Sequence, residues 1–141
     1  MENEVQQQQK EPRGFRNRNP LNLIISDNAW LGKVQNNTDG HFEQFTSYYY
    51  GLRAAFINAR TIIKRNAPCS VQKLISIWAP AFENNVQAYV SHVCKKGTLT
   101  AHETLNFKNM NQMCRLLWAM TEVENGKTLP FHMYESAYKM C

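Results

Sequence analysis

The chain has 141 residues, of which 43% are apolar and 19% charged, a length and balance typical of one globular domain. Seven Phe, six Tyr and three Trp residues need a core, which excludes a disordered chain, and no apolar run approaches the ~18 residues of a membrane-spanning helix. The net charge of +5 favours a polyanionic partner, such as nucleic acid, anionic lipid or a cell-wall polymer, without choosing among them.

Residues 1–12 are Gln-rich and charged, and we expect a disordered leader there. This leader has no apolar stretch of the kind that a secretory signal contains. Residues 13–141 are expected to form a single domain. The four cysteines include no CxxC pair, so we expect reduced thiols rather than a zinc ribbon.

The segment from Asn22 to Phe45 has the pattern of short strands separated by turns. The runs NLIIS, AWLGKV and HFEQF predict strands at 22–26, 29–34 and 41–45, and the intervening SDN and NNTDG are typical turn sequences. The segment therefore predicts a small antiparallel β wing near the N-terminus.

From Ser47 onward the apolar residues recur three or four positions apart, as on the buried face of a helix. Ser70 is a suitable N-cap, and Asn125-Gly126 is a typical C-terminal stop. The predicted helices cover 47–66, 70–78, 83–96, 107–124 and 131–140. The expected fold class is α+β and mainly helical.

Several catalytic motifs are present only in part. His102-Glu103 begins like HExxH, but Asn106 stands where the second zinc ligand is required. Ser70 and Lys73 match the SxxK of penicillin-recognising enzymes, yet the other motifs of that class are missing or out of order. No phosphate-binding glycine loop occurs. We therefore expect neither a metal nor a cofactor.

A cluster of asparagines lies in residues 13–32, RGFRNRNPLNLIISDNAWLG. The amides of Asn17, Asn19 and Asn22 both donate and accept, which suits sugar hydroxyl and acetamido groups, and Trp30 offers a flat face for a pyranose ring. An alternative is that the asparagines form Asx turns that only shape a loop.

Five motifs follow one another over residues 13–130: RGFRNRNPLNL, W-x-G, G-L-R-A, W-A-P-x-x-E-N and E-N-G. In this order they resemble a family of small phage virion structural proteins and endolysins, regarded as lysozyme-like peptidoglycan hydrolases. The resemblance implies a lysozyme-like fold that cleaves β-1,4 glycosidic bonds without a cofactor. It also implies peptidoglycan and virion components as partners. With no secretory signal, such a protein is expected in the host cytoplasm or the virion, reaching the wall by a separate route.

The resemblance also assigns substrate-binding positions. Two departures from the family pattern are Arg18, where a third Asn is usual, and Val123, where a His is common beside the acid. The positions carried over are Arg16, Asn17, Asn19, Asn22, Trp30, Tyr89 and Asn125.

Glu124 is the candidate general acid for glycosidic cleavage. It ends an apolar helix before Asn-Gly, and desolvation there would raise its pKa and keep it protonated. Glu43 and Glu83 are candidates for the second catalytic group. The alternatives are an exposed helix-end acid for Glu124, a solvent-facing strand residue for Glu43 and a helix N-terminal charge for Glu83. Since the acid helix follows the wing, a lysozyme-like fold would be circularly permuted.

The sequence alone leaves three functions open. The first is a peptidoglycan-cleaving phage lysin, acting by hydrolysis or by lytic transglycosylation. The second is a non-catalytic virion component that binds cell wall. The third is a nucleic-acid-binding module that uses the basic cluster Arg13, Arg16 and Arg18.

Overall fold

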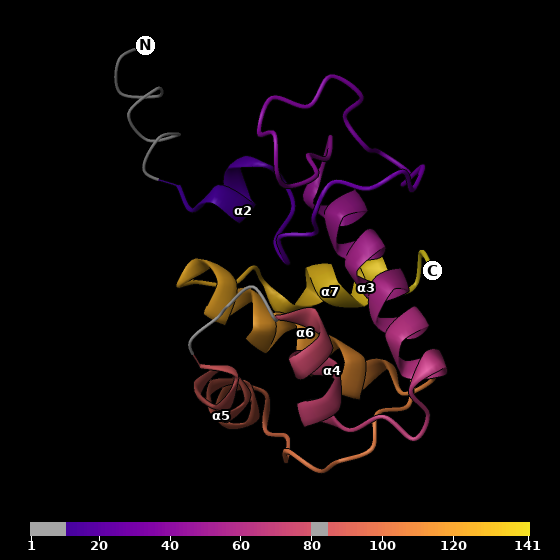
Figure 1. The fold of residues 1–141 in the computed structure, drawn as a ribbon, viewed down its shortest axis with the longest axis vertical. Helices are drawn as coiled ribbons and strands as arrows, with labels where there is room; N and C mark the ends of the chain where they lie inside the picture. The colour runs from indigo at the N-terminus through magenta and orange to yellow at the C-terminus, as the bar shows by residue number, and fades with distance from the viewer. Residues whose placement is uncertain (1–10, 80–84) are drawn as a thin grey trace.

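The computed structural model describes residues 11–79 and 85–141 (Figure 1). Helices dominate these two ranges, which confirms the expectation of a mainly helical chain. In chain order the helices are α2 (Arg13–Arg16), α3 (Tyr48–Arg65), α4 (Val71–Trp78), α5 (Val86–Gly97), α6 (Met110–Asn125) and α7 (Phe131–Tyr138).

The helix boundaries follow from local capping. Ser70 caps α4 as predicted, its hydroxyl accepting from the Lys73 amide at 3.0 Å. The long helix α6 begins at Met110 rather than at 107, because the Asn109 side chain accepts from the Gln112 amide and makes Asn109 the N-cap. It ends where expected, at Gly126 in the left-handed conformation. The short α2 was not predicted.

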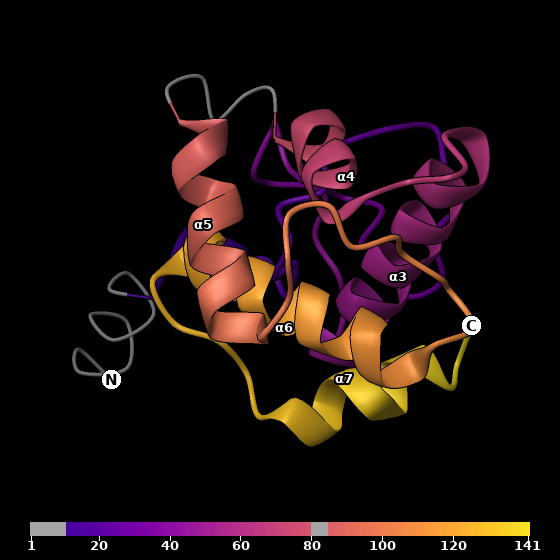
Figure 2. The ribbon, with the colours of Figure 1, turned by 90° about the horizontal axis from the view of Figure 1, so that it is seen from below.

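The core lies along α6, whose buried face contacts α5 on one side and α7 on the other (Figure 2). Helix α3 packs on α7 through the stripe that the helical period predicted, which includes Leu52, Phe56 and Ala59. Within the two described ranges, no helix combines the length and apolarity needed to cross a membrane.

The predicted β wing does not form: residues 22–45 are an irregular loop with two isolated antiparallel bridges, Ile24–Phe42 and Lys33–Phe45. The physical reason is that polar side chains satisfy the backbone groups that a ladder would use. Asn19 bonds both the N–H and the C=O of Leu23, and the Asp39 carboxylate accepts from the His41 and Phe42 amides.

This loop covers one end of the helical body, above the start of α3 (Figure 1). A small apolar cluster of Leu23, Phe45 and Ala54 holds it there, with Trp30, Tyr50 and Trp78 packed alongside. Its position brings the asparagine-rich segment close to the C-terminal end of α6.

Candidate active site

Glu124 lies in the last turn of α6, directly before the chain turns away at Gly126. Its carboxyl group accepts two hydrogen bonds, from Nδ2 of Asn22 to Oε1 and from the Tyr89 hydroxyl to Oε2, each at 2.9 Å. Because each oxygen accepts only one of these bonds, a lone pair remains free to carry a proton. The acid is thus fixed between the loop, α5 and α6.

Burial raises the pKa of Glu124 above the ordinary glutamate value, against the lowering effect of the hydrogen bonds from Asn22 and Tyr89. The negative end of the helix dipole also disfavours a carboxylate at this position. Tyr89 is only 2% exposed, and burial and the nearby Glu124 charge raise its pKa well above the usual tyrosine value. Tyr89 therefore stays protonated and donates to the carboxyl.

A cavity of about 280 Å³, here called the acid pocket, opens beside Glu124. Its walls come from α2, from both ends of the loop, from the end of α4 and from α6. They carry both apolar and ionisable side chains, among them one carboxylate. The lining residues are Arg13, Leu21, Asn22, Ile24, His41, Phe42, Trp78, Ala79 and Glu124.

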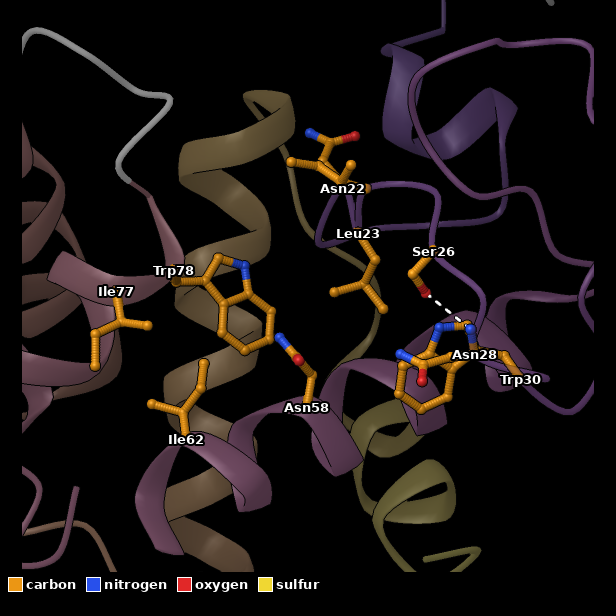
Figure 3. A pocket seen from close by; sticks show the side chains of 10 residues that line it. Asn22, Leu23, Ser26, Asn28, Trp30, Asn58, Ile62, Ile77 and Trp78 are labelled. Carbon is orange, nitrogen blue, oxygen red and sulfur yellow. Dashed lines mark hydrogen bonds between the residues drawn. The ribbon is translucent and has the colours of Figure 1, made fainter. Parts of the chain in front are cut away.

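A second cavity of about 350 Å³ adjoins the first, since Asn22, Ile24 and Trp78 line both (Figure 3). We call it the neutral groove, because none of its described lining residues is ionisable. Figure 3 shows Asn58, Ile62 and Trp78 on the helical side and the loop residues across from them. The lining residues are Asn22, Leu23, Ile24, Ser26, Asn28, Trp30, Asn58, Ile62, Ile77 and Trp78.

The loop wall of the acid pocket is fastened by an ion pair between Arg13 and Asp39. Nε and Nη2 of Arg13 donate to the two carboxylate oxygens, each at 2.8 Å, and the guanidinium lies over the Phe42 ring. Arg13 is the main reason that the pKa of Asp39 lies well below its usual range. This arrangement holds Phe42 and His41 at the pocket.

Replacing Asp39 with Asn is expected to lower the melting temperature at pH 7 by a few degrees. The pKa of Asp39 is lower in the folded than in the unfolded chain, so its stabilising effect is complete above the unfolded value, about 4, and is lost as the pH falls below it. Thermal unfolding at several pH values should show the difference between parent and variant shrinking below about pH 4. A difference that stayed constant down to acid pH would contradict this role of Asp39.

The close approach of α2 to the acid depends on Gly14. A Cβ atom at this position would collide with the Asn125 amide and come within 3.0 Å of Oδ1 of Asn22, the residue that donates to Glu124. Asn125 in turn bonds the Pro20 carbonyl oxygen at 2.8 Å and so ties the end of α6 to the loop. Gly14 therefore permits the packing that positions the acid.

Substitution of Gly14 by Ala is expected to destabilise the fold by about 1–3 kcal/mol, because the added methyl group overpacks the contact with Asn125 and Asn22. Urea unfolding followed by circular dichroism measures this change. An unchanged unfolding midpoint would show that α2 does not pack against the two asparagines as tightly as the structure indicates.

The predicted substrate-binding asparagines differ in their surroundings. Asn17 and Asn19 are buried: the Asn17 amide bonds Asp39 and Gln44, and the Asn19 amide bonds the loop backbone. The Asn125 amide donates to the Pro20 and Thr121 carbonyl oxygens, so these three asparagines shape the backbone as Asx-type side chains do. Asn22 faces the acid and lines both cavities.

The other predicted binding residues are spread more widely. Trp30 lines the neutral groove, and Arg16 lies exposed on α2. Tyr89 is buried and contacts Glu124. In the basic cluster, Arg13 is paired with Asp39 and Arg18 lies over the Tyr48 ring, so neither guanidinium is wholly available to a phosphate.

One candidate for the second catalytic group, Glu43, does not line the acid pocket. Glu43 is fully buried inside the loop, where Oε2 pairs with Nζ of Lys33 at 3.1 Å and accepts from the Ser26 amide. It lies among the described lining residues of neither cavity. Glu83 lies outside the described residues. Among residues 11–79 and 85–141, no three His, Cys, Asp or Glu side chains are grouped so that they could hold a metal ion.

Sequence reasoning did not find His41, Phe42 or Asn58 as cavity residues. The Asn-x-Asp-Gly turn before His41 was visible as a turn, but nothing in the pattern showed that it folds back onto α2. Asn58 had a weak signal, since it lies one helical turn from both Ala54 and Ile62 on the inner face of α3.

No protein-family model matches the chain. Protein P5 of Pseudoalteromonas phage PM2 is 31% identical over 117 residues, which span 81% of this chain and 71% of the phage protein. The chain belongs to the family of this phage protein. The sequence-based expectation of a phage protein is therefore confirmed at the level of the family.

Proposed function

We propose that this member of the P5 family cleaves the β-1,4 glycosidic bonds of bacterial peptidoglycan, with Glu124 as the general acid. The observation that carries the proposal is a single carboxyl group of raised pKa, fixed by Asn22 and Tyr89 at the wall of a cavity. Glycosidic cleavage requires a carboxylic acid that is still protonated near neutral pH.

In the proposed reaction, Glu124 donates its proton to the glycosidic oxygen as the bond from the anomeric carbon to that oxygen breaks. The sugar left behind carries oxocarbenium-like charge, and the carboxylate formed on Glu124 keeps its hydrogen bonds from Asn22 and Tyr89. A hydroxyl group then attacks the anomeric carbon and returns its proton to Glu124, which restores the acid.

The source of that hydroxyl distinguishes two routes. In lytic transglycosylation the attacking group belongs to the same sugar and closes an anhydro ring, so one carboxyl group suffices. Hydrolysis uses water and a second carboxylate, for which Glu83 is the proposed residue. Glu43 pairs with Lys33 inside the loop, and we assign it a structural role.

The fold that accompanies this proposal is a circularly permuted lysozyme-like one. Two features support this fold. The acid ends a helix before a glycine turn, and the loop of residues 22–45 precedes this helix in the chain. Asn22 and Trp30 are the proposed substrate contacts at the cavities, and Arg16 is a further proposed contact on the exposed side of α2.

Mass spectrometry of the products tests this function. Purified protein incubated with insoluble peptidoglycan should release soluble glycan fragments. An anhydro end would identify transglycosylation, and a reducing end would identify hydrolysis and the sugar that carries it. If the protein sediments with the walls and releases no fragments, it is instead a non-catalytic wall-binding component.

A further inference from the structure

We propose that the neutral groove binds an uncharged N-acetylated hexose of the glycan strand, next to the bond that Glu124 cleaves. The inference rests on the proposed function. It adds which sugar of the glycan strand lies in which cavity. A neutral sugar is proposed to bind in the neutral groove, and any sugar with an acidic substituent is proposed to bind outside it.

The first observation is the contrast in charge between the two adjoining cavities. The acid pocket contains Arg13, His41 and Glu124, whereas the described lining of the neutral groove holds no ionisable side chain. The Lys33 ammonium bonds the backbone oxygens of Ser26 and Asn28 at this groove, but it is already paired with the buried Glu43 carboxylate. A carboxylate taken out of water into such a groove would therefore find no unpaired cation among its lining residues to compensate its lost solvation. The groove therefore selects a neutral ligand.

The second observation is the mixture of aromatic and aliphatic surface in the groove. Trp78 and Trp30 are half-buried, and Ile24 and Ile77 are 54% and 37% exposed although they are apolar. Sugar rings have C–H faces that pack on such surfaces and hydroxyl edges that stay wet. Because Trp78 lines both cavities, a ring packed on it would lie directly beside the acid pocket.

The third observation is the set of amides at the groove. The half-buried side chain of Asn58 and the exposed side chain of Asn28 make no hydrogen bond to any described residue, and Figure 3 shows Asn58 beside Trp78. A carboxamide donates and accepts at once, as the acetamido group of a hexosamine also does. A volume of about 350 Å³ lies at the lower end of the range for small-ligand sites and suits a single substituted ring.

The test uses oligomers of N-acetylglucosamine, titrated by calorimetry into the Glu124→Gln protein so that nothing is cleaved. We expect saturable binding that is insensitive to salt, because no ion pair is involved. Fully deacetylated oligomers, which lack the acetamido group and carry positive charge, should bind at least tenfold more weakly.

Asn58→Ala in the same background should weaken binding about threefold to tenfold, the effect of one lost neutral hydrogen bond. Because Asn58 has no described hydrogen-bond partner and Ala favours helices, the variant should fold, and Asn28→Ala provides a second, independent probe. Asn36→Ala, at an exposed asparagine outside both cavities, is the matched control and should bind like the parent.

Failure of this inference and failure of the proposed function give different results. No binding of the acetylated oligomers, or equal binding by the Asn58 and Asn36 variants, would overturn the neutral-sugar assignment even if the active protein cleaves peptidoglycan. Binding that depends on Asn58, with no cleavage of peptidoglycan by the parent, would uphold the sugar site and reject the enzymatic function.

Discussion

Replacement of Glu124 by Gln is expected to lower the rate of peptidoglycan cleavage by about a hundredfold to ten-thousandfold. Glutamine has nearly the same shape and can hydrogen-bond to Asn22 and Tyr89, so the fold should be kept, but it has no proton to give to the leaving oxygen. The measurement is the initial rate of clearing of a cell-wall suspension, together with a thermal unfolding curve for each protein.

Glu122 provides the matched control for this substitution. It lies on the same helix two positions earlier, but its carboxylate bonds His92 at 2.7 Å and Lys96 at 3.1 Å. Glu122→Gln loses these exposed ion pairs, which contribute little, and should clear walls at close to the parental rate. Equal clearing by the Glu124 variant and the parent would remove Glu124 from the mechanism.

Replacement of Tyr89 by Phe is expected to shift the pH dependence of the reaction. The Tyr89 hydroxyl donates to Oε2 of Glu124, which stabilises the charged carboxylate and lowers its pKa. Without this donor the pKa of Glu124 rises further. Because the reaction needs protonated Glu124, the limb on which activity falls with rising pH should move to higher pH.

Tyr138→Phe controls for the loss of a tyrosine hydroxyl elsewhere. Its hydroxyl donates to the Phe107 carbonyl oxygen at 2.6 Å, away from Glu124, so the variant should lose some stability and keep the parental pH profile. If the Tyr89 variant lost activity without any movement of the basic limb, Tyr89 would have only a structural role.

The helices of this chain could be predicted because their signals are local. The apolar period marked α3 and α6, Ser70 marked the start of α4, and Gly126 marked the end of α6. Each of these signals acts within one or two helical turns, so the pattern in the sequence and the structure agree there.

The loop of residues 22–45 was predicted as strands because short runs typical of strands, NLIIS, AWLGKV and HFEQF, are separated by turn sequences. Its conformation instead depends on hydrogen bonds between the backbone and the side chains of Asn19, Asn37 and Asp39, most of them donated by backbone N–H groups to side-chain oxygens. The sequence showed that these residues were suited to turns, but not which backbone groups they would bond. The same uncertainty hid the burial of Glu43, whose partner Lys33 lies on another part of the loop.

The role of Glu124 stays a prediction, and the structure adds two contacts that support it. Asn22 is 102 positions away in the chain and Tyr89 is 35 positions away. Tyr89 was predicted as a substrate contact. In the structure it is buried on α5, and its hydroxyl donates to Glu124. Only the packing of α5 and the loop against α6 brings these groups together, and no local pattern encodes such a contact.

Glu124 is expected to keep its proton at a pH where an ordinary glutamate has lost it. A nuclear magnetic resonance titration of ¹³C-labelled side-chain carboxyl groups, assigned with the Glu124→Gln variant, measures this directly. The midpoint for Glu124 should lie above the usual glutamate value of about 4.3. A midpoint at or below that value would contradict its assignment as the general acid.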